Sequence, residues 1–114
     1  MPMKVTTASS PFGSRTRTRV LAGLELLGES YPRELARVLG AGLSAVQKAV
    51  RSLERDSLIV GRTMGRTRLY GINPGFYAVG ELRSLARRVA DADIELQECV
   101  RGLRRRPRMR GKPL

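Results

Sequence analysis

The 114-residue sequence predicts a mainly α-helical protein that carries a small β-hairpin and ends in a long helix. Residues 14–53 contain three stretches of apolar residues at helical spacing, and glycines separate these stretches from one another. Residues 58–72 hold two short runs of branched and aromatic residues on either side of Gly65, which is typical of two strands and a turn. Between Pro74 and Pro107 no proline interrupts the helical spacing, so we expect one long helix there.

The first two helices are delimited by residues that favour helix ends. Ser14 can cap a helix over RTRTRVLAGLELL, and Gly28 can end it. Pro32 suits the first position of the second helix, and Gly40 ends that helix. The predicted core residues are Val20, Leu21, Leu24 and Leu27 beside Leu26 in the first helix, and Leu35, Ala36 and Leu39 beside Val38 in the second.

The third helix has one apolar face and one basic face. Ser44 is predicted to cap it over AVQKAVRSLERD, after a connection short enough for a helix-turn-helix. Its core face is Val46, Ala49, Val50 and Leu53, and its opposite face presents Ala45, Gln47, Lys48 and Arg51. Glutamine pairs well with adenine, arginine and lysine pair with guanine, and an alanine methyl can touch thymine. This face is therefore a candidate for reading DNA bases, and the alternative is an ordinary solvated helix face.

The predicted hairpin joins strands at 58–60 and 68–72 through the cationic segment GRTMGRT. Its arginines are Arg62, Arg66 and Arg68. We expect Arg66, which lies closest to the bend at Gly65, to contact DNA phosphate. The alternative is that these charges keep an edge strand from pairing with other chains. Residues 31–72 thus have the element order of a winged helix-turn-helix, which places its second helix in the DNA major groove.

The long C-terminal helix carries an apolar seam whose members are separated alternately by three and four residues. The seam consists of Leu82, Leu85, Val89, Ala92, Leu96, Cys99 and Leu103. The seam could pack back on its own domain or pair with a second copy. A helix of about 30 residues would be about 45 Å long, more than three helices can cover, so we favour a homodimer. The seam does not decide between parallel and antiparallel pairing, and Cys99 is expected to be a small buried hydrophobe.

The net charge of +12 lies mostly at the two ends of the chain. Residues 1–19 contain four basic residues and no acid, and residues 101–114 contain seven and no acid. Such ends add affinity for a polyanion without sequence information, and the alternative is a solubilising tail. We divide the chain into a disordered N-terminal arm (1–13), a winged helix-turn-helix domain (14–73), a dimerisation helix (74–105) and a basic tail (106–114).

Several function classes find no support in the sequence. It has one cysteine and no histidine, so we expect no disulfide, no metal site and no cofactor. We find no phosphate-cradling glycine loop and no nucleophile with a plausible base, so we do not expect an enzyme. There is no run of about 18 apolar residues and no apolar segment typical of a secretory signal, so the cytoplasm is the expected location.

The segment ELARVLGAGLSAVQKAVRSLERDSLIVGRTMGRTRLYGINP resembles the winged helix-turn-helix regulators of the ArsR type, and more loosely those of the MarR type. The resemblance covers residues 20–75 and implies a DNA-binding dimer. It implies that Ala45, Gln47, Lys48 and Arg51 face bases, that Ser44 contacts phosphate, and that Arg66, Thr67 and Arg68 belong to the wing. The family usually has glycine where this chain has Ser57, and the Cys and His clusters of its metal sensors are absent.

These observations predict a transcriptional regulator that binds double-stranded DNA sequence-specifically, as a homodimeric repressor on a palindromic operator. The operator, and any small-molecule effector, are left unknown by the sequence. Two alternatives remain: a nonspecific architectural DNA- or RNA-binding protein driven by the cationic ends, and an adaptor that docks on a larger protein.

Overall fold

The computed structural model describes residues 10–105. Three helices come first, α1 (Arg15–Leu27), α2 (Pro32–Leu39) and α3 (Leu43–Arg55). An antiparallel hairpin of β1 (Ile59–Met64) and β2 (Thr67–Ile72) follows, and then α4 (Val79–Asp91) and α5 (Ile94–Arg105). The predicted fold class, mainly α with one hairpin, is confirmed. Residues 1–9 of the expected arm and the tail 106–114 lie outside the described residues.

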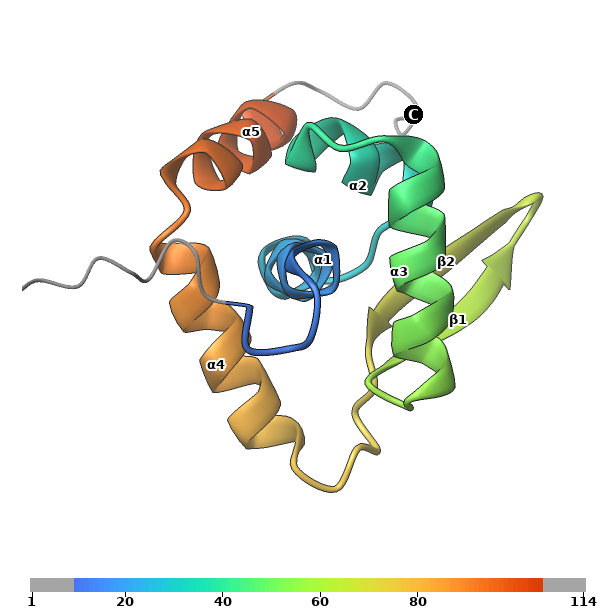
Figure 1. The fold of residues 1–114 in the computed structure, drawn as a ribbon. Helices are drawn as coiled ribbons and strands as arrows, with labels where there is room; N and C mark the ends of the chain where they lie inside the picture. Colours follow the sequence, from blue (N-terminus) through green and yellow to red (C-terminus); the bar gives the residue numbers. More distant parts are fainter. Residues whose placement is uncertain (1–9, 106–114) are drawn as a thin grey trace, which may run out of the picture.

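Helix α1 is the centre of the molecule. Figure 1 looks along this helix and shows the other four helices and the hairpin arranged around it. Its buried residues are Thr18, Val20, Leu21, Ala22, Gly23 and Leu24. Because six residues within two turns are buried, α1 is enclosed on more than the single face that its leucines and valine predicted. At Gly23 a Cβ atom would approach Leu35 Cδ2 of α2 to 3.3 Å, so α2 packs closely there.

Most of the predicted helix ends are confirmed. Ser14 caps α1, its side chain accepting a hydrogen bond from the Arg17 amide at 3.1 Å. Gly28 and Gly40 end α1 and α2 with φ of +86° and +61°. The predicted cap of α3 is wrong, because Gly42 is the capping residue and Ser44 is already the second helical residue. Gly40, Ala41 and Gly42 therefore connect α2 to α3.

Ser57 ends α3 in the left-handed conformation, with φ of +67°. This is the position at which the regulators that the segment resembles usually have glycine. The Ser57 and Leu58 amides donate to the Glu54 and Leu53 carbonyls, both at 3.0 Å. The chain thus makes the usual hydrogen bonds of a glycine-ended helix with a residue that has a Cβ.

The hairpin is longer than predicted on its first strand, and a third segment extends it. Ile59 pairs with Ile72 at one end and Met64 with Thr67 at the other, so Gly65 and Arg66 form a two-residue turn. Ser30, in the connection between α1 and α2, exchanges both backbone hydrogen bonds with Tyr70, at 2.8 and 3.0 Å. Strand β2 is therefore central, and the hairpin is anchored to the end of α1.

The single long C-terminal helix is wrong, because the chain breaks at Ala92 and Asp93 into α4 and α5. Asp93 Oδ1 accepts a hydrogen bond from the Leu96 amide at 3.1 Å and so caps α5. The Gln97 side-chain amide donates to the carbonyls of Ala90 and Asp91, at 2.8 and 3.0 Å, and satisfies the end of α4. The break is thus stabilised from both sides by side chains.

The apolar seam does not form a continuous stripe. In α4 the buried residues are Leu82, Ala86 and Ala90, a row that departs from the seam after Leu82, and in α5 they include Leu96 and Val100. Of the seam residues, Leu82 and Leu96 are buried, Val89 and Leu103 are half-buried, and Leu85, Ala92 and Cys99 are exposed. Cys99 is therefore not the buried hydrophobe that we expected. Because α5 folds back beside α2 and α1, much of its apolar surface serves the core.

Candidate nucleic-acid interface

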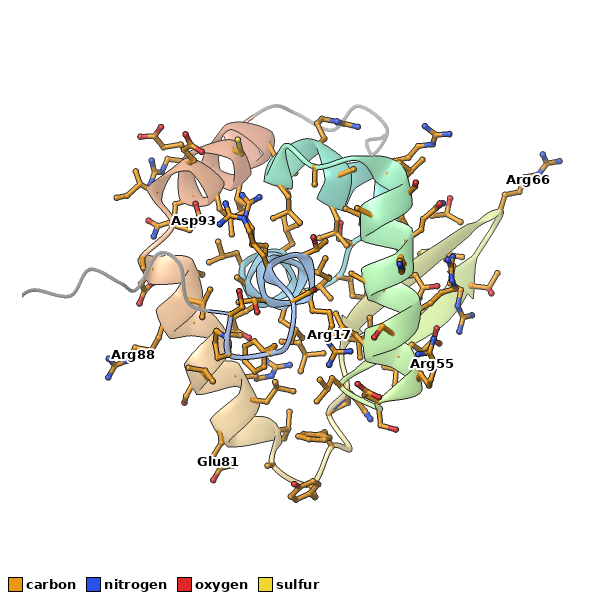
Figure 2. All side chains as sticks on the ribbon, viewed as in Figure 1. Arg17, Arg55, Arg66, Glu81, Arg88 and Asp93 are labelled. Atoms are coloured by element: carbon orange, nitrogen blue, oxygen red, sulfur yellow. The ribbon has the colours of Figure 1, made fainter. Side chains whose placement is uncertain are left out.

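Helix α3 divides its residues between core and solvent as its sequence predicts. Val46, Ala49, Val50 and Leu53 are buried, whereas the four candidate base-facing residues are exposed. Gln47, Lys48 and Arg51 make no hydrogen bond or ion pair with any other residue in 10–105. Arg55 continues the basic face by one turn and is also exposed (Figure 2). The helix therefore presents unpaired donors along one side.

Two serines of α3 differ from their expected environment. Ser44 is exposed at the second helical position, where its own amide is one of the free donors of the helix start. A phosphate could still approach this end of α3, although Ser44 does not cap it. The helical period places Ser52 on the side of α3 away from the core, but its hydroxyl accepts a 2.6 Å hydrogen bond from Arg17 and the residue is half-buried.

Arg66 occupies the tip of the hairpin and points away from the body of the protein (Figure 2). It is exposed and has no partner within the described part of the chain. Gly65 makes the turn possible because φ there is +63°. Thr67 follows, exposed, at the start of β2. The tip therefore offers one free guanidinium at the greatest reach of the wing.

The other two wing arginines are engaged by acids of their own chain. Arg62 forms a two-point contact with Glu29, its Nε and Nη2 donating to the carboxylate oxygens at 2.9 and 2.8 Å. These hydrogen bonds lower the pKa of Glu29 below its ordinary value and raise the pKa of Arg62. Both side chains are about half exposed, so the pair lies in contact with solvent.

Arg68 contacts more groups than Arg62 does. Its Nη2 donates to Glu54 Oε2 at 3.1 Å, and its guanidinium lies 5.6 Å from the centre of the Tyr70 ring. The hydrogen bond from Arg68 to Glu54, more than the contact with Tyr70, raises the pKa of Arg68. A Cβ atom at Gly61 would come within 2.8 Å of both Arg68 and Tyr70, so the glycine is what lets the two pack over β1. Arg68 thus fixes the wing against α3.

Helix α2 adds two basic residues that sequence reasoning missed. Arg33 and Arg37 are one turn apart, exposed, and without a partner among residues 10–105. In a helix-turn-helix the first helix crosses the DNA backbone, so these are candidate phosphate contacts. The sequence signal that could have identified them was the i, i+4 spacing of two arginines on a short helix whose other side is apolar.

Two exposed members of the seam, Leu85 and Ala92, border a hollow between the start of α1, the end of α4 and the start of α5. It has a volume of about 570 Å³. Leu85, Val89, Ala92 and Ile94 supply its apolar lining, while Arg15, Arg19, Arg88, Asp93 and Glu95 are among its polar residues. Leu85 and Ile94 are 41% and 62% exposed. The hollow therefore brings accessible apolar side chains together beside the predicted dimer interface.

Two other kinds of site find no support in the described part of the chain. Within 10–105 no three His, Cys, Asp or Glu side chains gather closely enough to hold a metal ion. No helix in the same range is long and apolar enough to cross a membrane.

Comparison with known proteins identifies the fold. No family model and no curated protein sequence matches the chain. Among solved structures, it is similar to the adhesin competence repressor (AdcR) from Streptococcus pyogenes, with a TM-score of 0.58 and 18% sequence identity. The match covers 82% of this chain and 68% of that chain. At this identity the likeness speaks for the fold alone, and that fold is the winged helix-turn-helix predicted from the sequence.

Proposed function

We propose that this protein is a transcriptional regulator that binds double-stranded DNA sequence-specifically. The observation that carries the proposal is the outer side of α3, where Gln47, Lys48 and Arg51 are exposed and unpaired on a helix rigidly packed by its opposite face. Long polar side chains on a fixed helix are what reading base edges in a major groove requires. The proposal needs no catalytic role and no cofactor, and under it we expect the protein in the cytoplasm with its DNA.

Contacts with the DNA backbone would come from the elements on either side of α3. We assign the wing contact first to Arg66, because Arg62 and Arg68 already have acidic partners. Ser44 and Thr67 would contribute polar contacts at the start of α3 and beside the wing tip. Arg33 and Arg37 would add positively charged contacts from α2, the helix that precedes α3. Such contacts position the protein and set the salt dependence of binding without reading sequence.

We also propose that the regulator acts as a homodimer on a palindromic operator. Buried Leu82 and Leu96 belong to the core of one chain, so the interface would use the exposed seam residues Leu85 and Ala92, together with Ile94 and Cys99. The apolar lining of the hollow at the α4–α5 junction supports this proposal, since accessible apolar surface of this kind favours a partner. A second copy would present a second α3 to the DNA.

Two likenesses bear on the type of regulator and on how it would act. The resemblance to ArsR-type and MarR-type regulators and the likeness to a protein named as a repressor both favour repression by occupying the operator. Neither decides between the two types. The described residues offer no cluster typical of a metal sensor, and the resemblance is therefore proposed without metal regulation.

The test is a comparison of Arg51→Ala with Arg66→Ala on sites selected from a random DNA library at about 150 mM salt. Arg51→Ala should relax the preference at one or two base positions, at a cost of about 1–3 kcal/mol on the preferred site. Arg66→Ala should weaken binding to all sequences alike and reduce the salt slope by about one unit. A palindrome in the selected sites would support the homodimer. Equal losses on every sequence for both variants would instead indicate a nonspecific binding protein.

A further inference from the structure

The two paired arginines of the wing lie on opposite faces of the hairpin and differ in the number of groups that contact them. Arg68 faces α3, where Glu54, the Tyr70 ring and the space above Gly61 all engage it. Arg62 faces the other way and has Glu29 as its partner among the described residues. Its side chain is 55% exposed. Of the two, Arg62 can change partners without disturbing a ring or a packed backbone.

Glu29 is placed opposite Arg62 by the fold. The adjacent Ser30 is bridged to Tyr70 of β2, and Glu29 Cγ lies 3.5 Å from the position of a Cβ at Gly71. At the same glycine the Gly28 carbonyl oxygen would be only 3.1 Å away, so the connection between α1 and α2 lies directly against β2. The Glu29 carboxylate is thus held beside the hairpin, and its two oxygens meet the guanidinium as phosphate oxygens would.

We propose that Glu29 is an intramolecular substitute for DNA phosphate: it occupies Arg62 in the free protein, and a backbone phosphate displaces it in the complex. The inference rests on the proposed DNA-binding function and adds to it a residue that sets affinity. The exchange is inexpensive, because an ion pair exposed to solvent contributes little to stability. A phosphodiester satisfies the same two donors and releases counterions from the DNA. Glu29 therefore lowers affinity for every DNA sequence while keeping Arg62 solvated and oriented.

The experiment measures binding of the full chain to a duplex of random sequence over a range of salt concentrations. Glu29→Gln should tighten binding by about 2–5-fold, because the phosphate no longer competes with a carboxylate for Arg62. Glu98→Gln is the matched control: it removes one exposed acid of α5, away from the hairpin, and reports the effect of net charge alone. Arg62→Gln should weaken binding and reduce the salt slope by about 0.9.

The double variant Glu29→Gln/Arg62→Gln separates exchange from general electrostatics. If Glu29 acts through Arg62, the double variant should bind as weakly as Arg62→Gln, with no gain from the loss of the acid. A gain of equal size in both backgrounds, or a gain no larger than that of Glu98→Gln, overturns the proposal. Weaker binding by Glu29→Gln also overturns it, since Glu29 would then serve only to hold the wing. Thermal unfolding of each variant should stay close to the parent, because the pair is exposed.

Retention on a heparin column tests whether a polyanion displaces Glu29 from Arg62, and it does not require that the protein read a DNA sequence. Glu29→Gln should elute at higher salt than the parent, and Arg62→Gln and the double variant should elute together at lower salt. If the parent binds no duplex but shows this heparin pattern, the proposed function fails and the exchange at Arg62 stands. If the parent binds DNA and the heparin pattern is absent, the proposed function stands and the role of Glu29 fails.

Discussion

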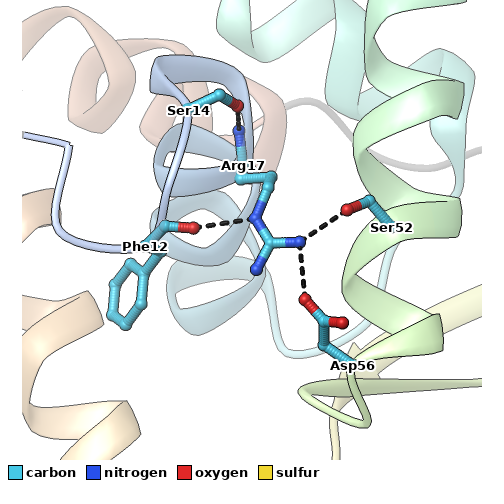
Figure 3. Close-up of polar contacts among 5 residues, drawn as sticks. All are labelled: Phe12, Ser14, Arg17, Ser52 and Asp56. Atoms are coloured by element: carbon cyan, nitrogen blue, oxygen red, sulfur yellow. Dashed lines mark hydrogen bonds and ion pairs between the residues drawn. The ribbon is translucent and has the colours of Figure 1, made fainter.

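Arg17 of α1 donates a 2.9 Å hydrogen bond to Asp56, the residue that comes directly after the last turn of α3. Figure 3 shows that the same guanidinium also reaches the Ser52 hydroxyl, at 2.6 Å, and the Phe12 carbonyl, at 2.7 Å. The Arg17 side chain is 19% exposed and the Asp56 side chain 52%, so the guanidinium is largely buried while its acidic partner is open to solvent. The central helix thereby fixes the C-terminal end of the candidate recognition helix.

We predict that Arg17→Met lowers the free energy of unfolding by about 1–2 kcal/mol, because it removes three hydrogen bonds of a partly buried charged group. Methionine retains most of the apolar stem, so lost packing contributes little. Arg15→Met is the control: Arg15 is an exposed arginine of the same turn without a partner in 10–105, and its loss should cost less than about 0.5 kcal/mol. Urea denaturation measures both. Equal effects would show that the three contacts contribute nothing.

Ser57→Gly should stabilise the fold by about 0.5–1 kcal/mol. A residue with a Cβ in the left-handed region costs about 1–2 kcal/mol, and the greater freedom of glycine in the unfolded chain cancels part of the gain. The Asn73 side chain donates to the Ser57 backbone carbonyl at 2.9 Å, and this contact survives the change. Ser57→Ala keeps the Cβ and should bring no gain in the urea midpoint. A gain with alanine would point to the hydroxyl instead of the backbone.

Gly61→Ala should destabilise the protein by about 1–3 kcal/mol, the usual cost of an added methyl group in a packed site. Its Cβ would lie 2.8 Å from Arg68 Nε and from Tyr70 Cε1, and the Tyr70 ring is buried. The natural comparison is Gly80→Ala in α4, where a Cβ meets nothing within 4 Å and alanine favours the helix. Thermal melting should move down for the first variant and up or not at all for the second.

Asp93→Ala should cost about 1–2 kcal/mol, because Asp93 caps α5 and also lies 3.5 Å from Arg19. Asp93→Asn retains an oxygen for the Leu96 amide and removes the charge, so it should lose less than alanine. The difference between the two isolates the cap. If asparagine were as damaging as alanine, the ion pair with Arg19 would be the more important contact.

Local signals predicted the helix ends and the hairpin well. Ser14, Gly28, Gly40 and Gly65 act through their own backbone or their nearest amides, so their roles are visible in a short stretch of sequence. The apolar and polar sides of α3 follow from its helical period alone, because they do not depend on how another element packs. The exposed candidate residues of α3 could therefore be placed from sequence, although their contact with DNA stays a prediction.

Contacts between distant segments were not predictable in the same way. The pairs Arg17–Asp56 and Arg62–Glu29 join different elements, and neither pair has a spacing that a periodic pattern would detect. In α4 the residues that face the core include two alanines, Ala86 and Ala90, which weigh less in a hydrophobic pattern than the seam beside them. The larger side chains of the seam therefore suggested a continuous helix surface that the cap at Asp93 interrupts.

The bridge between Ser30 and Tyr70 has a consequence for the order in which the chain folds. It joins the end of the first helix to the second strand across the entire helix-turn-helix, so the hairpin cannot be anchored until those helices have docked. Closing such a distant contact early would be entropically costly. The amides of β1 and β2 should accordingly gain protection from hydrogen exchange after those of α1 and α3 during refolding. The hairpin would then be the last part of the winged helix-turn-helix to fold.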